Sequence, residues 1–223
     1  MFPLRDINRT EKTPIVTKLL VAINIIIFVY TLLSPNYEEI INIYGFRPIY
    51  LYTLQHLDTL LTSMFLHGGL EHIIGNMWFL WIFGDNVEDK LGKANYIILY
   101  LLSGIFGSIL FTLTSSNPYI VAIGASGAVS GVLGAYLILF PNARIVTLVP
   151  LGYYFYRIIE IRAVYYIFIW FLLQAFFASV SLFALVNVRV AYWAHIGGFI
   201  IGLLFGLYGR ARGLHLKYLD TYL

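Results

Sequence analysis

The chain lacks cysteine and is poor in charged residues. None of its 223 residues is Cys, and only 11% are Asp, Glu, Lys or Arg, against about 25% in ordinary soluble domains. The absence of thiols excludes disulfides, thiolate catalysis and cysteine-based metal sites. Hydrophobic residues make up 60% of the chain, and its mean hydropathy is +0.82. With so few charges, water is excluded as the main solvent of the folded chain. The sequence therefore predicts an integral, multi-pass membrane protein surrounded by a lipid bilayer.

Apolar runs close to the length of a membrane span recur along the whole chain. A transmembrane helix needs about 20 such residues. No soluble module interrupts the runs, so we expect one domain over residues 1–223 with an all-α fold of six transmembrane helices. The expected spans cover residues 15–34, 64–83, 94–114, 125–140, 161–186 and 190–208. The long connection at 34–58 mixes Tyr, Pro and charge, and we expect it to lie on the membrane surface.

Basic residues are distributed unequally between the two sides of these spans. With the N-terminus inside, twelve of the fourteen Lys and Arg residues fall on the inner side, and only Arg47 and Arg189 fall outside. Such a bias orients helices during insertion, so both termini are expected to be cytoplasmic. The basic residues form no stripe that would suit a nucleic acid, and no nucleic-acid partner is expected.

Polar residues of three spans fall at a similar shallow depth below the outer face. His67, His72 and Asn76 belong to the second predicted span, Ser126 opens the fourth and His195 lies early in the sixth. An ionisable side chain within a bilayer is costly, so intramembrane histidines point to a functional site. His67 and His72 are badly spaced to share a metal from a regular helix, and no metal is expected. For His67, helix capping, loop packing and a role in the site all stay open.

Ser126 has the surroundings of a nucleophile. Gly124, Ala125 and Gly127 flank it at a loop-to-helix junction, where glycine permits close approach and the first backbone amides have no acceptor within the helix. Such amides, with the helix dipole, can bind the oxyanion of a tetrahedral intermediate. We therefore predict Ser126 as nucleophile, with the amides of Ser126 and Ala125 in an oxyanion hole. Ser130, in contrast, is expected to bond back to its own helix.

His195 is the candidate base for that serine. It is the only histidine on the later spans, and it shares a helical face with Gly198 and further glycines, along which another helix can approach. No Asp or Glu lies near it in the later spans, so we predict a Ser–His dyad in which packing on Tyr192 or another aromatic ring orients the imidazole. His72 and Asn76, four residues apart on one face, are expected to add two oxyanion donors.

Three motifs resemble those of the rhomboid intramembrane serine proteases, and the likeness covers most of the chain. The segment from His67 to Asn76 resembles the second-span motif. Gly124-Ala125-Ser126-Gly127-Ala128 is similar to the nucleophile motif, and Ala194-His195-Ile196-Gly197-Gly198 is similar to the base motif. The order and spacing of the motifs agree with the order of the spans.

The resemblance implies a six-helix bundle with a water-filled cavity open to the outside. It implies that the substrates are single-span transmembrane proteins, cut near a small residue where the helix unwinds easily. A half-submerged first loop and a lateral gate at the fifth span are also implied, although the first loop lacks the Trp-Arg pair of some bacterial members. The family needs no cofactor, and a prokaryotic cell membrane is the expected location. The oligomeric state is left open.

Two other functions fit parts of the sequence. A small channel or transporter would use the same His and Ser residues to line a path for protons or solutes. A catalytically inactive relative would bind membrane helices without cutting them. Other intramembrane proteases fit worse, because the chain has no His-Glu-x-x-His motif and its carboxylates cluster outside the spans.

Overall fold

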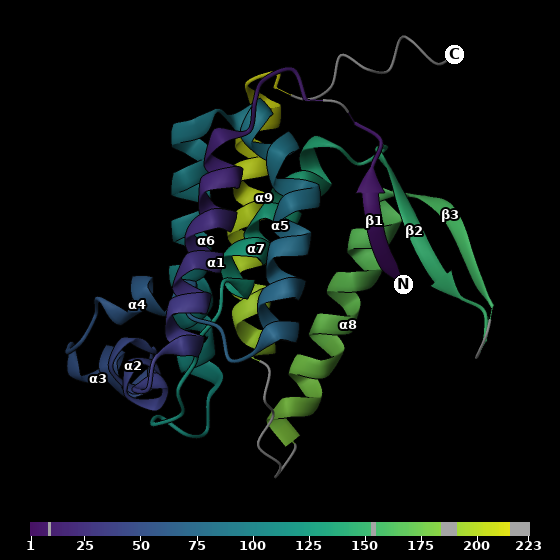
Figure 1. Ribbon diagram of the computed structural model, residues 1–223. Helices are drawn as coiled ribbons and strands as arrows, with labels where there is room; N and C mark the ends of the chain where they lie inside the picture. Colours follow the sequence, from purple (N-terminus) through teal and green to yellow (C-terminus); the bar gives the residue numbers. More distant parts are fainter. Residues whose placement is uncertain (9, 153–154, 184–190, 215–223) are drawn as a thin grey trace, which may run out of the picture.

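The computed structural model describes residues 1–8, 10–152, 155–183 and 191–214, and helices dominate it (Figure 1). Its longer helices are α1 (Ile15–Leu33), α5 (Leu70–Leu91), α6 (Lys93–Thr114), α7 (Ser126–Leu139), α8 (Ala163–Phe183) and α9 (Tyr192–Ala211). They form a bundle in which α9 packs against α6, α7 and α8. The helical membrane bundle predicted from the sequence is confirmed.

Four helices are long and apolar enough to cross a membrane. They are Ile15–Leu33, Lys93–Thr114, Ala163–Ser181 and Tyr192–Ala211, and they agree with the first, third, fifth and sixth predicted spans. Residues 184–186 and 190, the predicted ends of two spans, lie outside the described residues. The count of six spans is not confirmed, because α5 carries several charged residues and α7 has only 14 residues.

Helix α7 is shorter than the predicted span 125–140. Its 14 residues, at 1.5 Å each, cover about 21 Å, whereas the hydrocarbon core of a bilayer is about 30 Å thick. A helix of this length cannot reach both membrane surfaces. α7 alone is therefore too short to span the hydrocarbon core.

Helix α5 begins and ends later than the predicted span 64–83. It starts after Gly69 and ends before Gly92, whose φ of 80° favours glycine. The placement of His67 on this span is therefore wrong, because His67 lies in the loop that precedes the helix. Residues 84–90, which lie between the second and third predicted spans, continue the helix. Their polar side chains find partners within the protein, as when Asn86 donates to Asp6 at 2.7 Å.

A small antiparallel sheet corrects the all-α prediction. Its strands are β1 (Phe2–Asp6), β2 (Arg144–Pro150) and β3 (Tyr156–Arg162), in the order β1-β2-β3. β2 and β3 pair from Arg144 with Arg162 to Pro150 with Tyr156. Both strands are rich in Ile, Val and other residues that favour extended backbone. The sequence reading treated this stretch as a link between spans and missed the hairpin.

The long connection after α1 folds into short helices beside the bundle (Figure 1). They are α2 (Tyr37–Tyr44), α3 (Pro48–Thr53), α4 (Thr59–Thr62) and a 3-10 turn at Ser63–Phe65. Phe46 and Ala122 exchange backbone hydrogen bonds of 3.1 and 2.8 Å, which fasten this connection to the segment that leads into α7. The connection therefore lies at the end of the bundle where α7 begins.

Glu88, near the end of α5, caps the start of α1. Its Oε1 accepts a hydrogen bond from the Val16 amide at 3.0 Å, and its Oε2 accepts from the amide and the hydroxyl of Thr17 at 2.8 and 2.9 Å. Pro14, which precedes α1, offers no side-chain cap. Amides in the first turn of a helix lack internal acceptors, so the buried carboxylate satisfies donors that would otherwise be unpaired.

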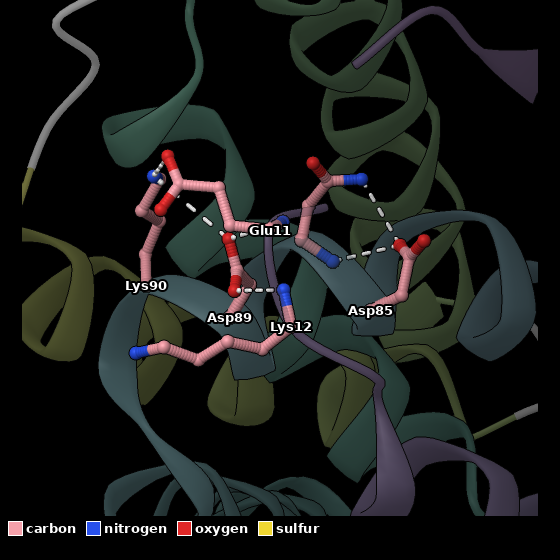
Figure 2. A network of polar contacts seen from close by, with 6 residues as sticks. Glu11, Lys12, Asp85, Asp89 and Lys90 are labelled. Carbon is pink, nitrogen blue, oxygen red and sulfur yellow. Dashed lines mark hydrogen bonds and ion pairs between the residues drawn. The ribbon is translucent and has the colours of Figure 1, made fainter. Parts of the chain in front are cut away.

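A second set of polar contacts fastens the segment before α1 to the same end of α5 (Figure 2). Asp89 accepts hydrogen bonds from the amides of Glu11 and Lys12 at 3.3 and 3.1 Å. The Lys90 ammonium lies 3.6 Å from the Glu11 carboxylate. Glu88 and Asp89 together fix where α1 begins relative to α5.

We expect Glu88→Ala to lower the free energy of unfolding by about 2–4 kcal/mol, because it leaves buried donors of Val16 and Thr17 unpaired. Reversible unfolding of the purified protein in mixed detergent micelles measures this change. Glu71→Ala is the matched control, since Glu71 is an exposed glutamate of the same helix. Equal stability of the two variants would contradict the capping role.

Candidate active site

Helices α7 and α9 approach each other through glycine. A Cβ built on Gly198 would overlap the carbonyl oxygen of Gly127, and one built on Gly202 would overlap the carbonyl oxygen of Gly131. Both obstacles are backbone atoms, which cannot rotate away as a side chain can. The two small-residue faces predicted from the sequence therefore meet at backbone-to-backbone distance.

The two candidates for nucleophile and base stand next to this contact. Ser126 is the first residue of α7, and His195 is the fourth residue of α9. A Cβ on Gly127 would lie 3.5 Å from the carbonyl oxygen of Ala194. Ser126 precedes Gly127 and His195 follows Ala194 in the chain, so the helix ends that carry the two predicted residues are neighbours.

Gly124 lies against the two polar side chains of α5. A Cβ at this position would come within 2.5 Å of His72 Nε2 and 3.7 Å of Asn76 Nδ2. The φ of Gly124 is 121°, a conformation that side chains disfavour, and its amide donates to the Ser63 carbonyl at 2.9 Å. Glycine here lets the segment before Ser126 lie directly on His72 and Asn76.

His72 Nε2 and Asn76 Nδ2 are hydrogen-bond donors without an acceptor among the described residues. The Gly68 amide donates to His72 Nδ1 at 3.4 Å, so in the neutral imidazole Nε2 carries the proton. Asn76 is 8% exposed, and its Nδ2 is buried without a hydrogen-bond partner among the described residues. Two N–H donors from α5 thus point toward the start of α7.

His67 packs beside the site. Its ring is fully buried and meets the ring of His72 edge-on, with centroids 5.1 Å apart. Among the described residues neither ring nitrogen has a hydrogen-bond partner. This geometry supports loop packing against His72, one of the roles that the sequence left open. Ser130 bonds back to the Ser126 carbonyl at 2.6 Å, as predicted.

Gln174 of α8 is the residue near the site that sequence reasoning missed. Its Oε1 lies 2.7 Å from His195 Nδ1. Trp170, one turn earlier, stacks on the imidazole with centroids 6.4 Å apart, and Tyr192 meets it edge-on at 6.1 Å. Aromatic packing on Tyr192 was expected, but the amide was not. The available signal was a lone amide side chain in an otherwise apolar run, which needs a partner in a membrane.

A small cavity of about 30 Å³ opens beside Ser126 and Gly124. Ser63 and Ser108 also line it. This volume is enough for one or two water molecules, and the two hydroxyls give such water polar partners. In the described part of the chain, no three His, Asp or Glu side chains are grouped so that they could hold a metal ion.

A family model for the Rhomboid domain matches residues 54–212, which include α5 to α9 and all of the candidate site residues. The chain belongs to the rhomboid family. The match covers more than half of the sequence, and the resemblance recognised from the three motifs is confirmed.

Rhomboid proteins from yeast, plants and bacteria are similar to this chain. "Rhomboid protein 1, mitochondrial" of Saccharomyces cerevisiae is 35% identical over 162 residues, 67% of this chain and 41% of the yeast protein. "RHOMBOID-like protein 4" of Arabidopsis thaliana is 36% identical over 66% of this chain and 32% of its own. "Rhomboid protease GluP" of Bacillus subtilis is 35% identical over 56% of this chain and 24% of its own.

The matched regions span less than half of each of these rhomboid relatives. The family model covers residues 54–212, the region that holds the three motifs. Because the relatives include a mitochondrial protein as well as bacterial ones, family membership does not decide between cellular membranes. The prokaryotic cell membrane stays a prediction.

Gly198→Ala should destabilise the bundle by about 1–3 kcal/mol, because the added methyl group must push α9 away from the Gly127 carbonyl. The unfolding midpoint in detergent measures the effect. Gly75→Ala on α5 is the matched control, since no atom lies within 4 Å of a Cβ built there, and alanine favours helix over glycine. A Gly198→Ala protein as stable as the unaltered one would contradict the close backbone contact.

Proposed function

We propose that this rhomboid protein is an intramembrane serine endopeptidase that hydrolyses peptide bonds in or near the transmembrane helices of single-span membrane proteins. The observation that supports this most is the close approach of Gly127 and Ala194, because Ser126 and His195 are the chain neighbours of these two residues. In this proposal Ser126 is the nucleophile and His195 is the general base, acting as a dyad.

The proposed reaction proceeds through an acyl-enzyme. His195 Nε2 takes the proton of the Ser126 hydroxyl while Oγ attacks the scissile carbonyl carbon. The tetrahedral intermediate collapses, the imidazolium gives its proton to the leaving amine, and an ester to Ser126 remains. Water then attacks the ester, His195 takes its proton and returns it to Ser126 Oγ, and the new carboxylic acid leaves.

The proposed oxyanion hole lies between α5 and the start of α7. His72 Nε2–H and Asn76 Nδ2–H would donate from one side, and the amides of Ser126 and Ala125 from the other. Among the described residues these two amides have no hydrogen-bond acceptor, which is typical of the first turn of a helix. Buried donors that already face the reacting carbonyl stabilise its negative charge without reorganising.

The proposed site must admit water for hydrolysis. Hydrolysis needs water, and a transmembrane helix offers no free carbonyl group until it is locally unwound. We propose that α7 begins below the outer surface, so that the cavity beside Ser126 takes water from that side. In this orientation both termini are cytoplasmic and the whole chain, residues 1–223, acts as one membrane domain.

We expect Ser126→Ala and His195→Ala each to abolish cleavage of a reporter protein with a single transmembrane helix, because each removes one half of the dyad. The assay uses purified protein in detergent. A fluorophosphonate probe should label Ser126 in the unaltered protein and fail to label it in His195→Ala. The control, Ser130→Ala, removes a hydroxyl that bonds back to its own helix and should keep cleavage.

Retained cleavage by Ser126→Ala would show that the nucleophile is another residue. A channel or transporter would be favoured if the protein neither cleaved the reporter nor reacted with the probe, and if Ser126→Ala still transported a proton or solute. A protein that binds membrane helices but never reacts with the probe would be an inactive relative.

Asn76→Ala should slow turnover on the order of 10- to 1000-fold, the cost of one lost oxyanion donor. The Michaelis constant should change little, because the bond forms mainly to the transition state. Steady-state cleavage of the same reporter separates the two constants. A rise in the Michaelis constant at unchanged turnover would instead place Asn76 in substrate binding.

A further inference from the structure

Gln174 is the one side chain with an amide group in α8. The helix also contains Ser179 and Ser181, but their hydroxyls bond to the carbonyl oxygens of Ala175 and Ala178 of the same helix. Gln174 instead crosses to α9, where its Oε1 lies 2.7 Å from His195 Nδ1. It is half-buried, so this hydrogen bond lies in a medium where an unpaired amide is costly.

The direction of this bond selects one form of the imidazole. An amide oxygen can only accept a hydrogen bond, so Nδ1 must carry the proton when Oε1 faces it. In the neutral ring Nε2 then has a free lone pair. That form can take a proton from a hydroxyl at Nε2, whereas the other tautomer cannot.

The ring of His195 is also held by the residue one turn before Gln174. Trp170 and Gln174 are four residues apart and therefore share a face of α8. Trp170 stacks on the imidazole with an angle of 28° between the planes, and it also packs against Phe199 of α9. Stacking fixes the plane of the ring, and the hydrogen bond fixes its rotation within that plane.

A neutral acceptor suits this location. The sequences of α8 and α9 contain no Asp or Glu, so no carboxylate of these helices can take this place. A buried carboxylate without a full set of partners would carry a large desolvation cost in the bilayer, and an amide carries a smaller one. An amide oxygen can still hold the Nδ1–H proton and orient the ring.

We propose that Gln174 is a positioning residue that accepts a hydrogen bond from His195 Nδ1–H and so keeps Nε2 available as the base for Ser126. This inference rests on the proposed protease function. Gln174 touches neither the substrate nor Ser126 in this role and acts through His195 alone.

The test compares Gln174→Met, which keeps the length of the side chain but removes the acceptor, with Gln174→Glu, which restores an acceptor and adds charge. Turnover, the Michaelis constant and the rate of Ser126 labelling by a fluorophosphonate are measured against pH in detergent. Ser179→Ala, which removes a polar group of the same helix away from His195, is the control.

Gln174→Met should lower turnover and the labelling rate on the order of 10- to 1000-fold, because a misoriented base of the wrong tautomer loses much of general-base catalysis. The Michaelis constant should stay unchanged. Gln174→Glu should recover labelling and move the acidic limb of the pH–rate profile to higher pH, because a nearby carboxylate stabilises the protonated imidazole. Ser179→Ala should match the unaltered protein throughout.

The tautomer itself provides an independent measurement. The nitrogen NMR spectrum of protein labelled at histidine should show protonated Nδ1 and bare Nε2 for His195, with a mixture or the reverse in Gln174→Met. The proposal is overturned if this spectrum, the labelling rate and the pH profile do not differ between Gln174→Met and the unaltered protein. It is also overturned if Gln174→Met loses activity together with stability and Gln174→Glu recovers neither.

Failure of the proposed function would look different. If Ser126→Ala still cleaved the reporter, the nucleophile would be wrong whatever Gln174 does. If Ser126→Ala were inactive while Gln174→Met remained fully active with an unchanged profile, only the positioning role of Gln174 would be lost.

Discussion

The close approach of α7 and α9 is the contact on which the rest of the site depends. Two glycine positions of α9 face carbonyl oxygens of α7 at distances that leave no room for a Cβ. In a bilayer, helices gain little from burying apolar side chains away from lipid, so association relies on close packing of this kind. The backbone contact fixes the separation of the two helices whose adjoining ends carry Ser126 and His195.

Polar groups are treated differently at the two ends of α5. Toward its end, Glu88 accepts three hydrogen bonds from the first turn of α1, so buried donors and acceptors satisfy one another and hold the fold. Toward its start, the amide nitrogen of Asn76 is buried without a partner among the described residues. An unsatisfied buried donor costs stability, and a catalytic role that completes the bond is one explanation for it. The polar groups that Glu88 pairs stabilise the fold, whereas the free amide of Asn76 lies where the oxyanion is proposed to bind.

The proposed site combines residues from four helices that differ in their attachment to the bundle. α7 and α9 are joined through glycine, and α5 touches the segment before Ser126 at Gly124. α8 stands at the edge, beside the sheet (Figure 1), and it reaches His195 through Trp170 and Gln174. The orientation of the imidazole therefore depends on the placement of α8 as well as on the helix that carries His195.

The sequence by itself determined the membrane character, the rhomboid family and the candidate residues. Ionisable and amide side chains are rare and costly within apolar runs, so His195, His72 and Asn76 stand out against their neighbours. Ser126 stands out because glycines flank it at a loop-to-helix junction. The short α7, the true limits of α5, the sheet and the place of His67 were decided only by tertiary structure. Where a helix or strand begins and ends depends on partners distant in sequence, as when Glu88 of α5 caps α1. A local sequence pattern does not contain such partners.

Gln174 shows the same limit most clearly. The sequence displays an amide in an apolar helix but does not show which neighbour it meets, because that depends on the rotation of α8 about its axis and on its distance from α9. Only the packed structure, in which the amide oxygen meets His195 Nδ1, assigns it a partner. Local chemistry thus selected the reactive groups, while the long-range packing of helices decided how they are held.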